Sequence, residues 1–222
     1  MPLMIGVDTS VLHDPQGRLP AGALVGGHLW WRLRSRASIP GMRTLTYSVN
    51  VTLDGCIDHR EGRPDAEVHQ LAAEALAQAD GLLLGRVTYE LMEQSWRPPA
   101  SDAFPDWMQH FARTIHEIPK YVALATLEGV DWNAGLLGGD VREAVLELKS
   151  RPGGPLRLGG SAFATDVVGW GLVDEYEFTV HPWVAGHGPY LLAGLPRPLG
   201  LTPTARHALA SGAVATTYRP RA

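Results

Sequence analysis

The sequence has little cysteine and no strong excess of either charge. Cys56 is the only cysteine among 222 residues, which excludes an intrachain disulfide and a cluster of thiolate zinc ligands. The formal net charge is -4 at pH 7, so we expect no basic surface that would bind nucleic acid or an anionic membrane. This composition predicts a cytoplasmic protein without a nucleic-acid or membrane partner.

Long apolar runs are missing too. The most apolar stretch near the start, residues 21–33, is interrupted by Gly26, Gly27, His28 and Arg32, and it is too short to cross a bilayer. Its arginines follow the apolar residues, which is the reverse of the order in a secretory signal. Residues 1–41 also lack the sustained periodicity of apolar residues that marks a helix or a strand. We therefore expect them to form an N-terminal extension, with the core fold over residues 42–222.

The sequence shows no pattern typical of a metal site or a serine hydrolase. The nine histidines lack the spacing of metal ligands, so no bound metal is expected. Ser161 lacks the G-x-S-x-G elbow of a hydrolase nucleophile. We interpret His181 as the end of a strand and Trp183, like Trp107, as a packing residue.

A regular alternation of strands and helices begins after residue 42. Apolar residues at every second position predict a first strand at residues 43–53, and an apolar stripe at helical spacing follows Asp65. Further strands are predicted at residues 81–85, 121–127 and 156–158, and further helices from residues 86, 104, 140 and 162. This alternation predicts an α/β fold, a central and mostly parallel sheet with helices on both faces.

The last part of the chain changes its pattern. Residues 173–182, 199–209 and 213–219 predict consecutive strands, with turns and few helical signals between them. Consecutive strands of this kind pair antiparallel. We therefore expect a mixed sheet with an antiparallel C-terminal edge.

The first of two strand-to-helix turns follows an apolar strand. Gly85 ends that strand, and Arg86 and Thr88 begin a helix. A helix start has unpaired backbone N–H groups and the positive end of the helix dipole, so it favours an anion. These residues suggest a bound phosphate. The alternative is an ordinary turn with a solvated arginine.

A second turn repeats this arrangement. Gly159 and Gly160 follow a short strand, and Ser161 stands where the next helix would have its N-cap. If the two strands are parallel neighbours, both turns lie at the carboxyl edge of the sheet, where open α/β sheets bind ligands. One diphosphate bound by both turns would explain them. The alternative is that the glycines only permit tight packing of strand against helix.

Several motifs in order indicate a family. They are residues 54–55, 84–90, 120–122, 148–149, 158–161, 172–175 and 181–182. The set resembles the dihydrofolate reductase-like family, with a closer likeness to the C-terminal reductase domain of bifunctional riboflavin-biosynthesis enzymes and their stand-alone relatives. The resemblance covers residues 42–219. It implies a three-layer fold with a central mixed sheet, a homodimer, NADPH bound across the sheet edge, and reduction of a pteridine- or pyrimidine-like heterocycle.

The resemblance also assigns site residues. The implied cofactor contacts are Val49 beside the nicotinamide, Gly85, Arg86 and Thr88 at the first turn, and Gly159, Gly160, Ser161 and Ala162 at the second. Asp54 matches the acid of the family's opening turn and is the candidate catalytic residue, although a histidine or bound water could equally supply a proton. Asn50 is expected to flank the nicotinamide on the substrate side.

Two departures from the family pattern affect the ligands. Many relatives place a serine and an arginine after the third strand to bind the adenosine 2′-phosphate, where this sequence has Leu124 and Ala125. NADPH is the expected cofactor, with NADH as the alternative, and Arg86 and Thr126 are the remaining candidate anchors. The acid that faces the pterin in dihydrofolate reductases corresponds to His69, which argues against folate as the substrate.

These observations predict an NAD(P)H-dependent reductase that transfers hydride to a small heterocycle. Trp96 could stack on a flat ring, or it could pack in the core. His69 could face the substrate, or it could lie on a solvated helix face. The alternative function is a non-catalytic nucleotide-binding or ligand-sequestering module with the same fold.

Overall fold

The computed structural model describes residues 41–63, 65–123 and 129–221. The strands of this part are β1 (Leu45–Thr52), β2 (Gly81–Gly85), β3 (Lys120–Ala123), β4 (Ala134–Leu137), β5 (Leu156–Leu158), β6 (Glu175–His181), β7 (Leu201–Ala208) and β8 (Val214–Pro220). The α-helices are α1 (Ala66–Ala77), α2 (Arg86–Trp96), α3 (Asp106–Glu117), α4 (Val141–Ser150) and α5 (Ala162–Gly169). The expected N-terminal extension falls outside these residues except for Gly41, so the division at residue 42 stays a prediction.

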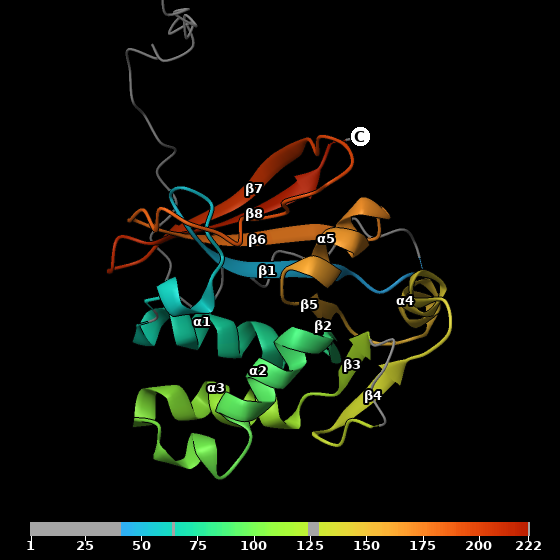
Figure 1. The fold of residues 1–222 in the computed structure, drawn as a ribbon, viewed down its shortest axis with the longest axis horizontal. Helices are drawn as coiled ribbons and strands as arrows, with labels where there is room; N and C mark the ends of the chain where they lie inside the picture. The colour runs from blue at the N-terminus through green and yellow to red at the C-terminus, as the bar shows by residue number, and fades with distance from the viewer. Residues whose placement is uncertain (1–40, 64, 124–128, 222) are drawn as a thin grey trace, which may run out of the picture. The chain divides into compact units, whose positions relative to one another are not determined.

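All eight strands belong to one sheet in the order β4-β3-β2-β5-β1-β6-β8-β7 (Figure 1). The pairs from β4 through to β6 are parallel. The pairs β6 with β8 and β8 with β7 are antiparallel. The predicted α/β fold with an antiparallel C-terminal edge is therefore confirmed.

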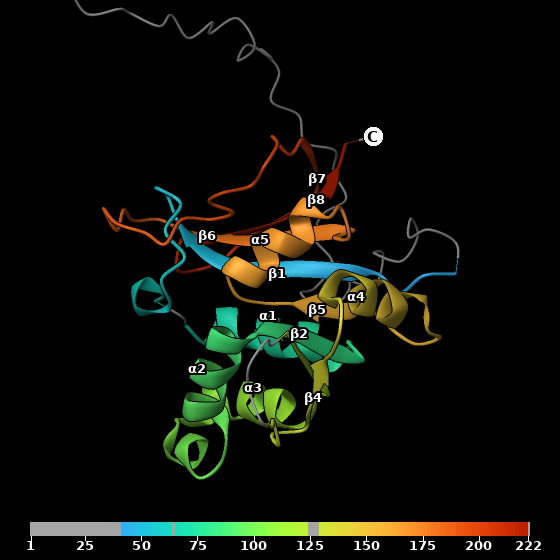
Figure 2. The same ribbon diagram turned by 45° about the vertical axis from the view of Figure 1, so that its right-hand side comes forward.

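The side chains of β2 divide between two hydrophobic cores. Leu83 belongs to one core, which includes Val167 of α5 and further residues of α4. Leu82 and Leu84 belong to the other core, which includes Ile115 of α3. Because successive strand residues point to opposite faces, the two cores lie on opposite sides of the sheet, with helices on each side (Figure 2).

Two helices begin where their capping residues predict. The carboxylate of Asp65 accepts a hydrogen bond from the backbone N–H of Val68 at 2.9 Å, at the start of α1. Asp140 accepts one from the N–H of Glu143 at 3.1 Å, at the start of α4. Each carboxylate satisfies an N–H group that the helix itself leaves unpaired.

The strand β4 has no counterpart in the sequence prediction. Its four residues show no alternation of apolar and polar side chains, and two of them are exposed. The strand exists because it pairs with β3 at the sheet edge, where Leu136 lies opposite Val122. Of the strand predicted at residues 121–127, the structure shows β3, and residues 124–128 lie outside the described part.

Candidate functional site

The two glycine turns lie next to each other at the carboxyl edge of the sheet. Their strands, β2 and β5, are parallel neighbours, with Leu83 opposite Leu158. The backbone N–H of Gly159 donates to the carbonyl of Leu83 at 3.0 Å, which holds the second turn beside the end of β2. The two turns therefore lie side by side at one sheet edge, as a ligand bound by both of them requires.

Close contact between the turns requires glycine at both. A Cβ atom on Gly160 would overlap the hydroxyl of Thr88, and Gly160 has a φ of +97°, which other residues rarely adopt. A Cβ atom on Gly85 would lie 2.8 Å from Cβ of Phe163 in α5. The glycines thus permit tight packing at both turns, and this packing is what places the starts of α2 and α5 side by side.

Neither of these two helix starts is capped by a side chain. Gly85 is the N-cap of α2 and Ser161 that of α5, and neither makes a side-chain capping hydrogen bond. The first N–H groups of both helices and the two helix dipoles therefore favour an anion at the same edge. Arg86 is half-exposed and pairs with Glu90 at 3.1 Å. A surface pair of this kind contributes little, so an anionic ligand can compete for the guanidinium.

Tyr47 of β1 supports the second turn from the core side. Its hydroxyl donates a hydrogen bond to the carbonyl of Gly160 at 3.0 Å. Burial raises the pKa of the Tyr47 hydroxyl, so the proton is retained for this bond. Sequence reasoning missed this role because an inward-facing tyrosine in a strand has the same pattern as any core residue.

Asp54 ties the loop after β1 to the loop after β6. Its carboxylate accepts hydrogen bonds from the hydroxyl of Thr52 and from the backbone N–H groups of Ala185 at 3.1 Å and Gly186 at 2.7 Å. These bonds, that of Thr52 first, lower the pKa of Asp54 to about 2. The carboxylate is therefore ionised at neutral pH. This environment favours a structural role over the proton-donating role that the sequence suggested.

The carboxyl ends of β1 and β6 bring Asn50 and His181 together. Nε2 of His181 lies 2.9 Å from Oδ1 of Asn50. His181 is only 2% exposed, and burial lowers its pKa. The ring of Trp183 follows, with its centroid 4.9 Å from that of His181. The sequence analysis treated His181 and Trp183 as structural, and only the fold shows that they adjoin a predicted substrate residue.

His69 and Trp96 lie in an aromatic cluster formed by α1, α2 and α3. Their ring centroids are 5.8 Å apart, and Trp107 meets His69 edge-on at 4.9 Å. His69 is 7% exposed, so the alternative of a solvated helix face is wrong. Burial lowers the pKa of His69, and its Nδ1 lies 3.3 Å from the carbonyl of Asp65.

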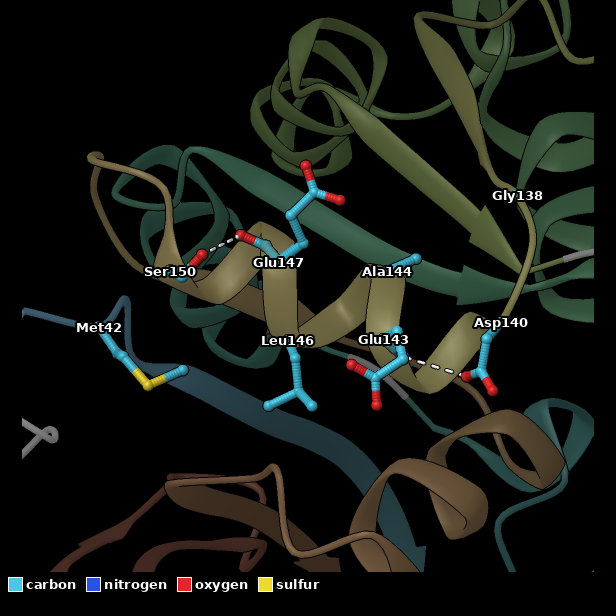
Figure 3. Close-up of a pocket in the computed structure, with 8 residues that line it drawn as sticks. All are labelled: Met42, Gly138, Asp140, Glu143, Ala144, Leu146, Glu147 and Ser150. Carbon is cyan, nitrogen blue, oxygen red and sulfur yellow. Dashed lines mark hydrogen bonds between the residues drawn. The ribbon is translucent and has the colours of Figure 1, made fainter.

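An open pocket of about 570 Å³ runs along α4 (Figure 3), and its lining includes none of the residues of the two glycine turns. Its lining includes the carboxylates of Asp140, Glu143 and Glu147, together with Met42. Three carboxylates would repel the phosphates of a dinucleotide. This cavity is therefore not a candidate cofactor site.

Some expected features fall outside what the structure can place. Thr126, with Leu124 and Ala125, lies outside the described residues, so a cofactor anchor there stays a prediction. Among the residues that are described, no group of three or more His, Cys, Asp and Glu side chains could hold a metal ion. Within the same residues, no helix has the length and apolar character to span a membrane.

Comparison with models of protein families shows which family the chain belongs to. The model of the RibD C-terminal domain matches residues 43–214. The chain belongs to the RibD C-terminal domain family. The resemblance inferred from the motifs is confirmed. A curated relative, YyaP of Bacillus subtilis (strain 168), is described as uncharacterized and is 30% identical over 180 residues, which are 79% of this chain and 94% of YyaP.

Solved structures share the fold of this RibD C-terminal domain. A protein of Shewanella sp. PV-4 named for riboflavin biosynthesis has a TM-score of 0.63 at 20% identity, and the match covers 81% of this chain and 99% of that one. Dihydrofolate reductase from Enterococcus faecalis, solved with NADP(H), has a TM-score of 0.55 at 13% identity, with 81% and 97% covered. At these identities the likeness establishes the fold alone.

The structure brings the predicted site residues of this RibD C-terminal domain into two groups. The first is the pair of turns, with Gly85, Arg86, Thr88, Gly159, Gly160, Ser161 and Ala162 at the ends of β2 and β5. The second starts at β1, where Val49 packs against the core and Asn50 is exposed. Because β1 is the neighbour of β5, the two groups are adjacent along one sheet edge.

Proposed function

We propose that this RibD C-terminal domain is an NAD(P)H-dependent reductase that transfers hydride to a small pyrimidine- or pteridine-like heterocycle. The observation that supports it most is the adjacency of two uncapped helix starts, at Gly85 and at Ser161. Together they offer one diphosphate two sets of backbone N–H donors. Membership of the RibD C-terminal domain family agrees with a reductase-type domain.

The residues at the turns fit a dinucleotide. The uncapped N–H groups, the hydroxyl of Ser161 and the guanidinium of Arg86 are all donors, and phosphate oxygens are acceptors. We propose NADPH as the cofactor, with NADH as the alternative. Arg86 is then the candidate partner of the additional 2′-phosphate.

A reduced nicotinamide supplies the hydride when the cofactor is bound. The residues of the chain bind and orient the reactants: the turns hold the phosphates, Val49 flanks the nicotinamide, and Asn50, His69 and Trp96 face the substrate. Holding two reactants in one geometry removes much of the entropic barrier. Because Asp54 is ionised, we propose that a histidine or bound water supplies the proton.

The substrate class is proposed from the names of structural neighbours. A Thermotoga maritima protein, of which the match covers 57%, is named a diaminohydroxyphosphoribosylaminopyrimidine deaminase/5-amino-6-(5-phosphoribosylamino)uracil reductase. A Corynebacterium diphtheriae protein is named pyrimidine reductase-like. We propose a substrate of this pyrimidine type. A cytoplasmic location and a homodimer complete the proposal, as the family resemblance implies.

The test is a turnover assay on the purified full chain. NADPH or NADH is mixed with a panel of pyrimidines and pteridines, and the absorbance of the reduced nicotinamide is followed. Oxidation that depends on the heterocycle supports the proposal. Tight cofactor binding without turnover on any compound favours the sequestering module, and no binding of either cofactor would overturn both.

A further inference from the structure

Asn50, His181 and Trp183 form a layered group at the carboxyl ends of β1 and β6. The register places Asn50 opposite Thr179 and His181 opposite Thr52. Residues at every second position share a face of the sheet, so Asn50 and His181 project to the same side. Their contact, 2.9 Å between Nε2 and Oδ1, joins residues 131 positions apart in the sequence.

This contact decides how the Asn50 amide is oriented. A neutral histidine that donates from Nε2 uses the amide oxygen of Asn50 as its acceptor. The amide nitrogen is then left as the outward group, since the hydrogen-bond network determines which end of an amide faces which neighbour. Asn50 is exposed while His181 is buried. The buried ring of His181 therefore determines that the exposed amide of Asn50 turns its N–H donors outward.

Trp183 supplies a second donor beside this pair. Its indole Nε1 is buried and has no hydrogen-bond partner in the structure, the one such side-chain atom found among the described residues. The His181 ring, at 4.9 Å, and the guanidinium of Arg63, 4.7 Å from the indole centroid, contact the same side chain. A buried N–H without an acceptor is unfavourable. An acceptor on a bound ligand would satisfy it.

We propose that Asn50 and Trp183 are a pair of uncharged donors that bind the acceptor atoms of the substrate, and that His181 is a positioning residue that holds Asn50. This inference rests on the proposed reductase function and narrows its substrate. The matching ligand is a flat, uncharged heterocycle whose edge carries carbonyl oxygens or ring nitrogens.

The experiment measures heterocycle binding by calorimetry on the full chain saturated with NADP⁺. The probes are uracil, thymine, pterin and lumazine. Trp183→Phe keeps an aromatic ring and removes the N–H, and Asn50→Leu removes the amide. Each variant is expected to weaken the best probe about tenfold, the effect of one lost hydrogen bond, and Trp183→Phe is expected to leave NADP⁺ affinity unchanged. Trp132→Phe is the matched control, because its indole N–H already donates to His116 at 2.9 Å.

The role of His181 is tested by rescue. His181→Leu should weaken the same probe about as much as Asn50→Leu, and the double variant should be no weaker than either, since the two residues act as one unit. His181→Gln keeps an N–H donor and should restore affinity to within about threefold. Asn50 is exposed, so its variant remains informative even if the His181 or Trp183 variants fail to fold.

The outcomes separate this inference from the function on which it rests. If neither NADP⁺ nor NAD⁺ binds, both are overturned. If NADP⁺ binds but none of the four probes does, or if Trp183→Phe and Asn50→Leu bind the best probe as tightly as the wild type, this inference alone is overturned. A His181→Gln variant as weak as His181→Leu would remove the positioning role.

Discussion

Two separate causes require glycine at position 160: its backbone conformation and the close packing between the two turns. Gly160→Ala should lower the free energy of unfolding by about 1–3 kcal/mol, because alanine is strained at positive φ and its Cβ would meet Thr88. Urea denaturation measures the loss. We also expect weaker NADPH binding, since the second turn must move.

A matched control separates the two causes. Gly171 has a φ of +72° and open space where a Cβ atom would lie, so Gly171→Ala reports the conformational strain without a clash. Gly160→Ala should lose more free energy of unfolding than Gly171→Ala, because only its Cβ atom meets Thr88. Adding Thr88→Ala to Gly160→Ala should remove this additional loss. Equal losses for Gly160→Ala and Gly171→Ala would show that the contact with Thr88 does not matter.

Asp54 makes the stability of the folded protein depend on pH in the acid range. Its pKa falls from 3.8 to about 2 in the folded protein, so the unfolded chain binds the proton more tightly. The stabilisation by Asp54 is therefore complete above about pH 4 and is lost as the pH falls towards about 2. Asp54→Asn should be less stable at neutral pH and should lose less stability across that acid range. Urea midpoints measured at several pH values check this, and parallel curves for variant and wild type would contradict it.

At the scale of the element, α2 and α5 offer their starts to a shared anion, and Arg86 adds a charge to the first. Arg86→Ala should weaken NADPH binding by about tenfold or more, the effect expected for a hydrogen bond to a charged group. If Arg86 contacts the 2′-phosphate, the loss for NADPH should exceed that for NADH. Titration of both cofactors measures these losses.

The fold should tolerate the Arg86→Ala substitution. The pair of Arg86 with Glu90 is exposed, so the free energy of unfolding should shift by no more than about 0.5 kcal/mol. Arg142→Ala, which removes a half-exposed arginine of α4, is the control and should leave cofactor affinity unchanged. Equal affinity of Arg86→Ala and the wild type for both cofactors would exclude Arg86 from the site.

The elements with a strong local signal were predictable from the sequence. The alternation in β1 and the capping carboxylates of α1 and α4 act over a few residues, so a local pattern contains them. The edge strand β4 has no such pattern and depends on its pairing with β3. The pair of Asn50 and His181 was not predictable either, because only the parallel register of β1 and β6 brings them together.

At the scale of the whole molecule, the strand order arranges the site. The neighbours β2, β5, β1 and β6 present, in that order, the first turn, the second turn, Asn50 and His181. Sequence order alone does not show this arrangement, since β5 is inserted between β1 and β2. A ligand extended along this edge would meet the phosphate donors at one end and the uncharged donors at the other.

The most direct test of this account is a crystal structure of the protein with NADPH. We predict that the diphosphate lies within hydrogen-bonding distance of the backbone N–H groups at the starts of both α2 and α5, with the nicotinamide beside Val49. A diphosphate that contacts only one of the two helix starts, or a cofactor bound elsewhere on the molecule, would contradict it.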